Sequence, residues 1–271
     1  MISVALALLA AVVVGLVVNY APGRGRRADP AEGSTPQTVL GATALLAAFV
    51  VALVLSGTAS SYSAASNAAK QEADAVSSLY ESAEYLDMPY RQNIQGAAVC
   101  FAKAVAGPEW KTLARGRRSS VPNNWTGTGP MGIRKNLLAM GVEAKGFSLI
   151  QSEDAKRGDL RNEMIRQANP TVPTALFWLM IALVAISLGT LAYGIPRAKN
   201  TPHLMSLVVV TGLFIATVGV LYNLDRPFSG ILALKPTSMR QTISDDAKHY
   251  SDAYRSTLPC DDQGAPVTPP K

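Results

Sequence analysis

The stretch "VPTALFWLMIALVAISLGTLA", residues 172–192, contains no charged side chain and is long enough to cross a lipid bilayer. The hydrocarbon core of a bilayer is about 30 Å thick, and a helix of about 20 apolar residues spans it. Core helices of soluble proteins seldom run this long without a charge. Three further runs share the property, at 2–18, 38–55 and 204–224. The sequence therefore predicts an all-α integral membrane protein with four transmembrane helices.

A long polar segment separates the second run from the third, so we expect a helical extramembrane domain inserted between these two spans. The expected boundaries are transmembrane helix 1 at 1–20, a short basic loop at 21–37, transmembrane helix 2 at 38–58, the helical domain at 59–171, transmembrane helix 3 at 172–193, a short basic turn at 194–203, transmembrane helix 4 at 204–224, and a tail at 225–271. The first run lacks the basic start and the A-x-A cleavage site of a signal peptide, so we expect it to be retained as a span.

Basic residues in the two short loops predict the orientation of the chain. Arg24, Arg26 and Arg27 lie in the first loop, and Arg197 and Lys199 lie in the second. Short basic loops stay on the cytoplasmic side of a membrane. We therefore expect a multi-pass plasma-membrane protein whose 59–171 domain and tail are extracytoplasmic.

The chain has two cysteines, Cys100 in the predicted domain and Cys260 in the tail. Four spans place both on the same side of the membrane. In an oxidising exterior the two thiols can form a disulfide. The sequence equally allows two unrelated thiols, and it leaves the choice between these open.

The domain 59–171 shows helical periodicity in three places. Small and apolar residues recur every three or four positions along 69–83 and again along 94–105, which predicts two antiparallel helices with Pro89 near the turn. The first of these is expected to continue the second span, because no helix breaker follows Gly57. A loop rich in glycine, proline and asparagine is expected at 115–132, and a third helix at 133–168. We interpret the charged end of that helix, "EDAKRGDLRNEMIRQA", as a solvated face.

The composition argues against several classes of function. The net charge of +6 is not gathered into a basic stripe with interleaved aromatic residues, so we expect no nucleic-acid partner. The only histidines, His203 and His249, are separated by the fourth span and cannot share a metal ion. The chain has no Gly-rich phosphate loop, HExxH or G-x-S-x-G motif. We expect no enzyme activity, no metal and no cofactor.

The spans themselves contain no Asp, Glu, Lys, Arg or His, which argues against proton-coupled transport. They contain small residues at a spacing of four, which lets helix backbones approach closely in lipid. These residues are Ala7, Ala11 and Gly15 in the first span, Ala44 and Ala48 in the second, and Gly212 and Ala216 in the fourth. The pattern predicts a tightly packed bundle or a homo-oligomer in the bilayer, or a subunit of a larger membrane complex.

Three motifs outside the spans resemble the bestrophin-like domain family, a bacterial and plant group of polytopic membrane proteins of unknown function. The motifs read E-A-x-x-x-x-x-L-Y, E-W and D-x-P-F-x-G. Their residues here are Glu72, Ala73, Leu79, Tyr80, Glu109, Trp110, Asp225, Arg226, Pro227, Phe228 and Gly230. The family often has a His-Asn pair before the second span, and "STPQT" stands here instead, which indicates a divergent member.

The last motif, "DRPF", stands where the fourth span meets water. Arg226 can reach lipid headgroups or pair with a carboxylate, Pro227 stops the helix, and Phe228 suits the interfacial layer. We interpret the motif as a helix stop and docking corner. A ligand or ion site is the alternative.

Two functions are consistent with these observations. The uncharged, small-residue spans favour a scaffold or accessory subunit of a membrane complex. The family resemblance implies the alternative, an oligomeric anion channel like the bestrophins. A channel would need a ring of hydroxyl groups in an oligomer, for which Thr43 and Ser187 are the predicted sources.

Overall fold

The computed structural model describes residues 2–21, 36–129, 131–194 and 201–267. The described residues are helical, apart from connections and an isolated β-bridge between Cys260 and Pro266. They divide into two units. The membrane unit comprises Met1–Ser60 with Pro170–Asp225, and the extramembrane unit comprises Ser61–Asn169 with Arg226–Lys271.

Four helices are long and apolar enough to cross a membrane. They are α1 (Ile2–Tyr20), α2 (Pro36–Ser82), α8 (Thr174–Tyr193) and α9 (Thr201–Leu224). Helix α2 has 47 residues, so it is about 70 Å long, more than twice the thickness of a hydrocarbon core. Only its apolar first part fits in the bilayer, and the helix continues past the predicted span without a break.

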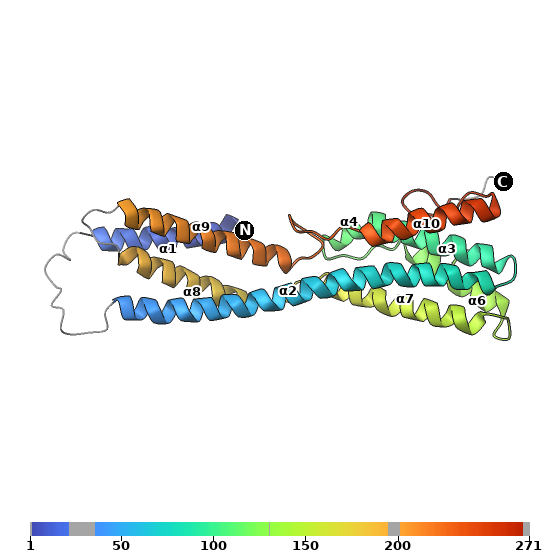
Figure 1. Ribbon diagram of the computed structural model, residues 1–271, viewed down its shortest axis with the longest axis horizontal. Coiled ribbons are helices and arrows are strands. Elements are labelled where there is room, and N and C mark those ends of the chain that lie inside the picture. The colour runs from blue at the N-terminus through green and yellow to red at the C-terminus, as the bar shows by residue number, and fades with distance from the viewer. Residues whose placement is uncertain (1, 22–35, 130, 195–200, 268–271) are drawn as a thin grey trace. The chain divides into compact units, whose positions relative to one another are not determined.

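Within the membrane unit, α1 packs along α8, and α9 contacts both (Figure 1). Gly15 of α1 faces Gly189 of α8 so closely that a Cβ atom at Gly15 would collide with the Gly189 carbonyl. The small-residue face of the first span therefore lets these two backbones approach, as such faces do in lipid. Ala48 of α2 and Gly212 of α9 are exposed in the single chain.

The extramembrane unit is built around α3 (Tyr90–Ala104), which is buried along most of its length. Helix α3 contacts the 3₁₀ turn η2 (Ala83–Tyr85) and four further helices. These are α5 (Asn123–Thr126), α6 (Ile133–Met140), α10 (Thr237–Tyr254) and the π-helix η3 (Val105–Glu109). The turn η2 precedes α3, and α4 (Trp110–Leu113) follows η3. Helix α7 (Phe147–Gln167) is the last helix of this unit before the chain enters the third span.

The helix expected at 133–168 is interrupted at 141–146, where the chain turns between α6 and α7. Gly141 and Gly146 adopt φ angles of 82° and 81°, in the left-handed region that only glycine enters freely. A second difference lies in the tail, where α10 forms although no helix is predicted there from the sequence. Its Met239 and Tyr250 are buried.

Residues 259–267, here called the C-terminal strap, are fastened to α3. Cys260 forms a disulfide with Cys100, so the structure has the paired form of the two alternatives that the sequence leaves open. The Nε1–H of the buried Trp125 donates to the Gly264 carbonyl at 2.6 Å. Gly264 has a φ of 71° and lies against the α3 backbone, where a Cβ atom would collide with Ala104. One covalent bond and one buried hydrogen bond thus hold a segment that has no helix of its own.

Breaking the disulfide should release the strap. For a loop of 160 residues, chain entropy sets an upper bound of about 5 kcal/mol on the stabilisation. The real effect should be smaller, because the spans tether both segments in the unfolded state. We expect Cys260→Ser to make the strap a preferred site of limited proteolysis, and wild type treated with reductant to be cleaved at the same rate. Free thiols in wild type purified without reductant would contradict the pairing.

Candidate functional site

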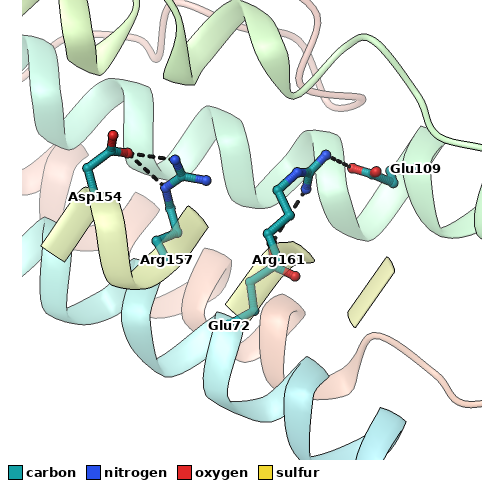
Figure 2. A network of polar contacts seen from close by, with 5 residues as sticks. All are labelled: Glu72, Glu109, Asp154, Arg157 and Arg161. Carbon is teal, nitrogen blue, oxygen red and sulfur yellow. Dashed lines mark hydrogen bonds and ion pairs between the residues drawn. The ribbon is translucent and has the colours of Figure 1, made fainter. Parts of the chain in front are cut away.

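Two buried carboxylates of the extramembrane unit share one arginine. Glu72 of α2 and Glu109 at the end of η3 are both fully buried, and Arg161 of α7 reaches between them (Figure 2). The Arg161 Nη1 lies 3.4 Å from Glu72 Oε1, and its Nη2 donates to Glu109 Oε2. We call these three residues the ion cluster. It connects α7 to two segments far away in the sequence.

The local sequence explains why Glu109 points inward. Pro108 has no N–H to donate, so the α-helical hydrogen-bond pattern of α3 cannot continue through it. The backbone widens into the π-helix η3, which ends at Glu109. Single π turns inside helices often occur at functional sites.

A second ion pair lies beside the ion cluster on α7. Both Nε and Nη2 of Arg157 donate to Asp154 Oδ1, at 3.1 and 2.6 Å, and both residues are buried. The guanidinium carbons of Arg157 and Arg161 lie 4.5 and 5.2 Å from the centre of the Phe101 ring. This ring of α3 thus receives two cation–π contacts, which are strongest when the cations are desolvated.

The cluster holds more negative charge than its arginine can neutralise. Burial raises the pKa of Glu72 from its ordinary 4.5 to about 7, with Glu109 adding to the rise and Arg161 opposing it. Burial also raises the pKa of Glu109. Glu72 Oε2 and Glu109 Oε1 are buried without a hydrogen-bond partner among the described residues. An arrangement of this kind can hold a proton near neutral pH, because protonation of one carboxyl removes the excess charge.

The E-A motif and the E-W motif meet in this cluster through Glu72 and Glu109. The remaining residues of the first motif, Ala73, Leu79 and Tyr80, are buried in the same core. These three side chains therefore pack the last turns of α2 into the core of the extramembrane unit.

The E-W and "DRPF" motifs also meet. The Trp110 ring contacts Phe228 edge to face, with centroids 5.1 Å apart, and its Nε1–H donates to the Leu234 carbonyl at 2.9 Å. The Leu234 N–H donates to the Pro227 carbonyl at 2.7 Å, and Gly230 turns the chain with a φ of 87°. Trp110 therefore anchors the loop that follows Arg226.

Asp225 has a separate role in the membrane unit. Its Oδ1 accepts hydrogen bonds from the backbone N–H groups of Thr171 and Val172, at 2.9 and 3.0 Å, just before α8 begins. Helix α9 ends at Leu224, immediately before Asp225. The last residue of the fourth span is thus followed by a carboxylate that holds the entry to the third. A ligand or ion role for Asp225 or Arg226 stays a prediction.

The interpretation of residues 153–168 as a solvated face is wrong for three of their charges. Asp154 and Arg157 are buried and Arg161 is nearly so. The spacing contained a signal, because Asp154, Arg157 and Arg161 fall on the same helical stripe as Ile150 and the apolar residues near the end of α7. Within the described residues, no group of three or more His, Cys, Asp or Glu side chains could hold a metal ion.

Replacing Glu72 by glutamine should reduce the pH dependence of stability. Glu72 lies beyond the predicted span 38–58, and burial raises its pKa in the folded protein to about 7. Between about pH 4.5 and 7 the folded protein therefore holds a proton on Glu72 that the unfolded chain has released. The free energy of unfolding of wild type should therefore fall as pH rises through this window. We expect Glu72→Gln, which keeps an oxygen acceptor for Arg161, to flatten this slope in melting curves from about pH 5 to 8. The exposed-site control Glu143→Gln should keep the wild-type slope, and equal slopes in all three proteins would contradict the assignment.

Comparison with known proteins identifies the family. The model of the Bestrophin-like domain family matches residues 4–239. No curated protein matches the chain. Solved structures match over nearly their whole length. A variant of a bacterial Bestrophin homolog from Klebsiella pneumoniae is 13% identical with a TM-score of 0.65, covering 94% of this chain and 100% of that one.

A second variant of the Klebsiella pneumoniae homolog is 14% identical, with a TM-score of 0.63, over 92% of this chain and 98% of that one. At such low identity the structures show a shared fold, and the family match covers most of the sequence. The chain is a divergent member of the bestrophin-like domain family.

Proposed function

We propose that this chain is the pore-forming subunit of an oligomeric anion channel. The observation that carries the proposal is the likeness to bestrophin homologues along nearly the entire length of both chains, with both the membrane and the extramembrane parts included. A protein that had kept only the spans, or only the extramembrane helices, would match part of that length. The family resemblance implies an anion channel, and the proposal transfers that activity to this chain.

The membrane part of α2 supports a pore-lining role. Its buried residues, Ala47, Val54 and Thr58, lie on one side of the helix. Phe49 and Ser56 are seven residues apart on the opposite side, and both are exposed. Ser60, just beyond the predicted span, continues this exposed stripe. The stripe therefore combines apolar side chains, Leu45, Phe49 and Leu53, with hydroxyl groups that can donate to an anion.

A single stripe cannot enclose a path for ions, but a ring of copies can. Closed symmetry places the same surface of every subunit around one axis. Rings of hydroxyl groups can replace part of the hydration of an anion, and a ring of phenylalanine side chains can form an apolar constriction. This mechanism needs no ionisable group in the span.

The sequence predicts Thr43 and Ser187, and not Ser56 and Ser60, as the sources of these hydroxyl groups. Ser187 is buried in the membrane unit, and its hydroxyl donates to the Leu183 carbonyl of its own helix at 2.8 Å. Thr43 is half-buried. We therefore assign the pore-facing hydroxyls to Ser56 and Ser60.

A scaffold or accessory subunit is the second candidate. The absence of Asp, Glu, Lys, Arg and His from the four predicted spans favours it, because charged rings are a common source of ion selectivity. The family and fold comparisons favour the channel more.

The channel proposal predicts anion flux that depends on Phe49. Purified protein in liposomes should show a chloride conductance that reverses with the chloride gradient and not with the potassium gradient. Phe49→Ala should raise the conductance several-fold, because it widens the apolar constriction. Leu213→Ala on α9 is a matched control, because Leu213 and Phe49 are each 68% exposed. An oligomer of correct mass that conducts no anion would favour the scaffold.

We also infer that the helical domain inserted between the second and third spans is extracytoplasmic, together with the tail. The disulfide between Cys100 and Cys260 supports this side, because disulfides persist in oxidising compartments. The two basic loops that predicted the orientation lie mostly outside the described residues.

Thiol labelling of intact cells tests the orientation. Single cysteines at Ala28→Cys and Ala198→Cys should resist an impermeant maleimide, because both loops are expected to be cytoplasmic. Val142→Cys should label readily, because Val142 is 71% exposed in the extramembrane unit. If the two loops were labelled and position 142 were protected, the proposed orientation would be wrong and the domain would be cytoplasmic.

A further inference from the structure

A second group of carboxylates lines a cavity on the extramembrane unit, away from the ion cluster. The cavity measures about 750 Å³ and lies where the end of α2 and the turn η2 approach α10. Its lining includes Glu81 and Glu84 from the first side and Asp245 and Asp246 from the second. Tyr80 and His249 also line it, with ring centroids 5.9 Å apart. We call this the acidic pocket.

Asp246 is the unusual member of this group. Its side chain lines the cavity but is only 7% exposed, and its Oδ2 has no hydrogen-bond partner among the described residues. A buried carboxylate oxygen without a hydrogen-bond partner costs free energy, which a bound cation would recover. Burial, with the Glu81 and Asp245 charges adding to it, raises the pKa of Asp246 to about 7. The remaining carboxylates of the pocket are exposed at its rim.

The size and layout of the pocket indicate the kind of cation. Among the described residues no three carboxylate or histidine side chains converge on one point, so the carboxylates do not form a cage for a small metal ion. The volume lies in the range of pockets for small organic ligands. Aromatic rings attract ammonium groups through their faces. An extended molecule with several separated ammonium groups matches a buried carboxylate at one point and exposed carboxylates at others.

The overall charge of the chain does not account for attraction of cations. The chain carries a net charge of +6, so its general field favours anions. Recognition of a polycation must therefore come from the local arrangement of the pocket.

We propose that the acidic pocket binds an aliphatic polyamine, with one ammonium group on Asp246 and others on the carboxylates of the rim. The proposal is independent of anion conduction, and it assigns the extramembrane unit a ligand of opposite charge to the ion of the proposed channel. A polyamine in the pocket would join α2 and α10, which both contribute carboxylates.

Calorimetric titration of the full-length protein in detergent with spermidine, at fixed ionic strength, tests the proposal. We expect saturable binding at one site, and a loss of affinity of about ten-fold or more in Asp246→Asn, because a desolvated charge partner is removed. Asp252→Asn is the matched control on α10. Asp252 is exposed and does not line the pocket, so its variant should bind as wild type does.

A double variant, Glu81→Gln with Glu84→Gln, tests the rim without changing the buried position. It should also bind spermidine more weakly, and it decides the matter if Asp246→Asn does not fold. Equal binding by wild type and the pocket variants would overturn the proposal, as would an equal loss in Asp252→Asn. Displacement of spermidine by equimolar Mg²⁺ would show an inorganic cation site instead. Binding of a lysine-rich peptide without any binding of spermidine would show that the pocket takes a protein partner, and would equally overturn it.

Discussion

Arg161 forms ion pairs with two buried carboxylates, and through them it ties α7 to α2 and η3. Glu72 and Glu109 come from helices far apart in the sequence, and neither can be buried as a charge without a partner. Removing one partner of a buried ion pair typically costs about 3–5 kcal/mol. That is a large share of the 5–15 kcal/mol that holds a whole domain folded. The contact therefore fixes which face of α7 turns toward α2 and η3.

The free-energy cost of burying a charge also shapes the membrane unit, which avoids this cost by having no charged side chains in its predicted spans. No lipid-facing helix can bury a charge cheaply, so the predicted spans contain none, and their helices approach through glycine and alanine. For this reason the four spans could be predicted from the sequence alone. The continuity of α2 was predictable too, because the sequence offers no breaker between the span and Pro89. The disulfide was not decided by sequence, since spacing along a chain says nothing of the distance between two thiols in space.

The sequence did not predict the places where polar side chains are buried in the extramembrane unit, or the turn between α6 and α7. Arg157 and Arg161 look like a solvated helix face, because alternating charges read the same whether water or Phe101 lies opposite them. Only the register of these charges with Ile150 indicated burial. The break between α6 and α7 depends on two glycines whose positive φ angles become necessary only once the chain turns. The role of Trp110 in the E-W motif also depends on tertiary structure, because its ring packs against Phe228 from a distant part of the chain.

Exposure alone does not separate a pore face from a lipid face. The exposed residues of α9 include Val208, Val209 and Leu213, large aliphatic groups that suit contact with acyl chains. Toward the end of its span, α2 exposes Ser56, but its earlier turns expose Leu45, Leu46 and Leu53, and α9 likewise exposes Ser206. A hydroxyl group facing hydrocarbon without need is unfavourable, whereas the same group facing water or another subunit is not. Both helices therefore expose a hydroxyl group that contact with another copy of the chain or with water would satisfy, and the proposal that α2 lines the pore rests on Phe49 and Ser56 sharing one exposed stripe.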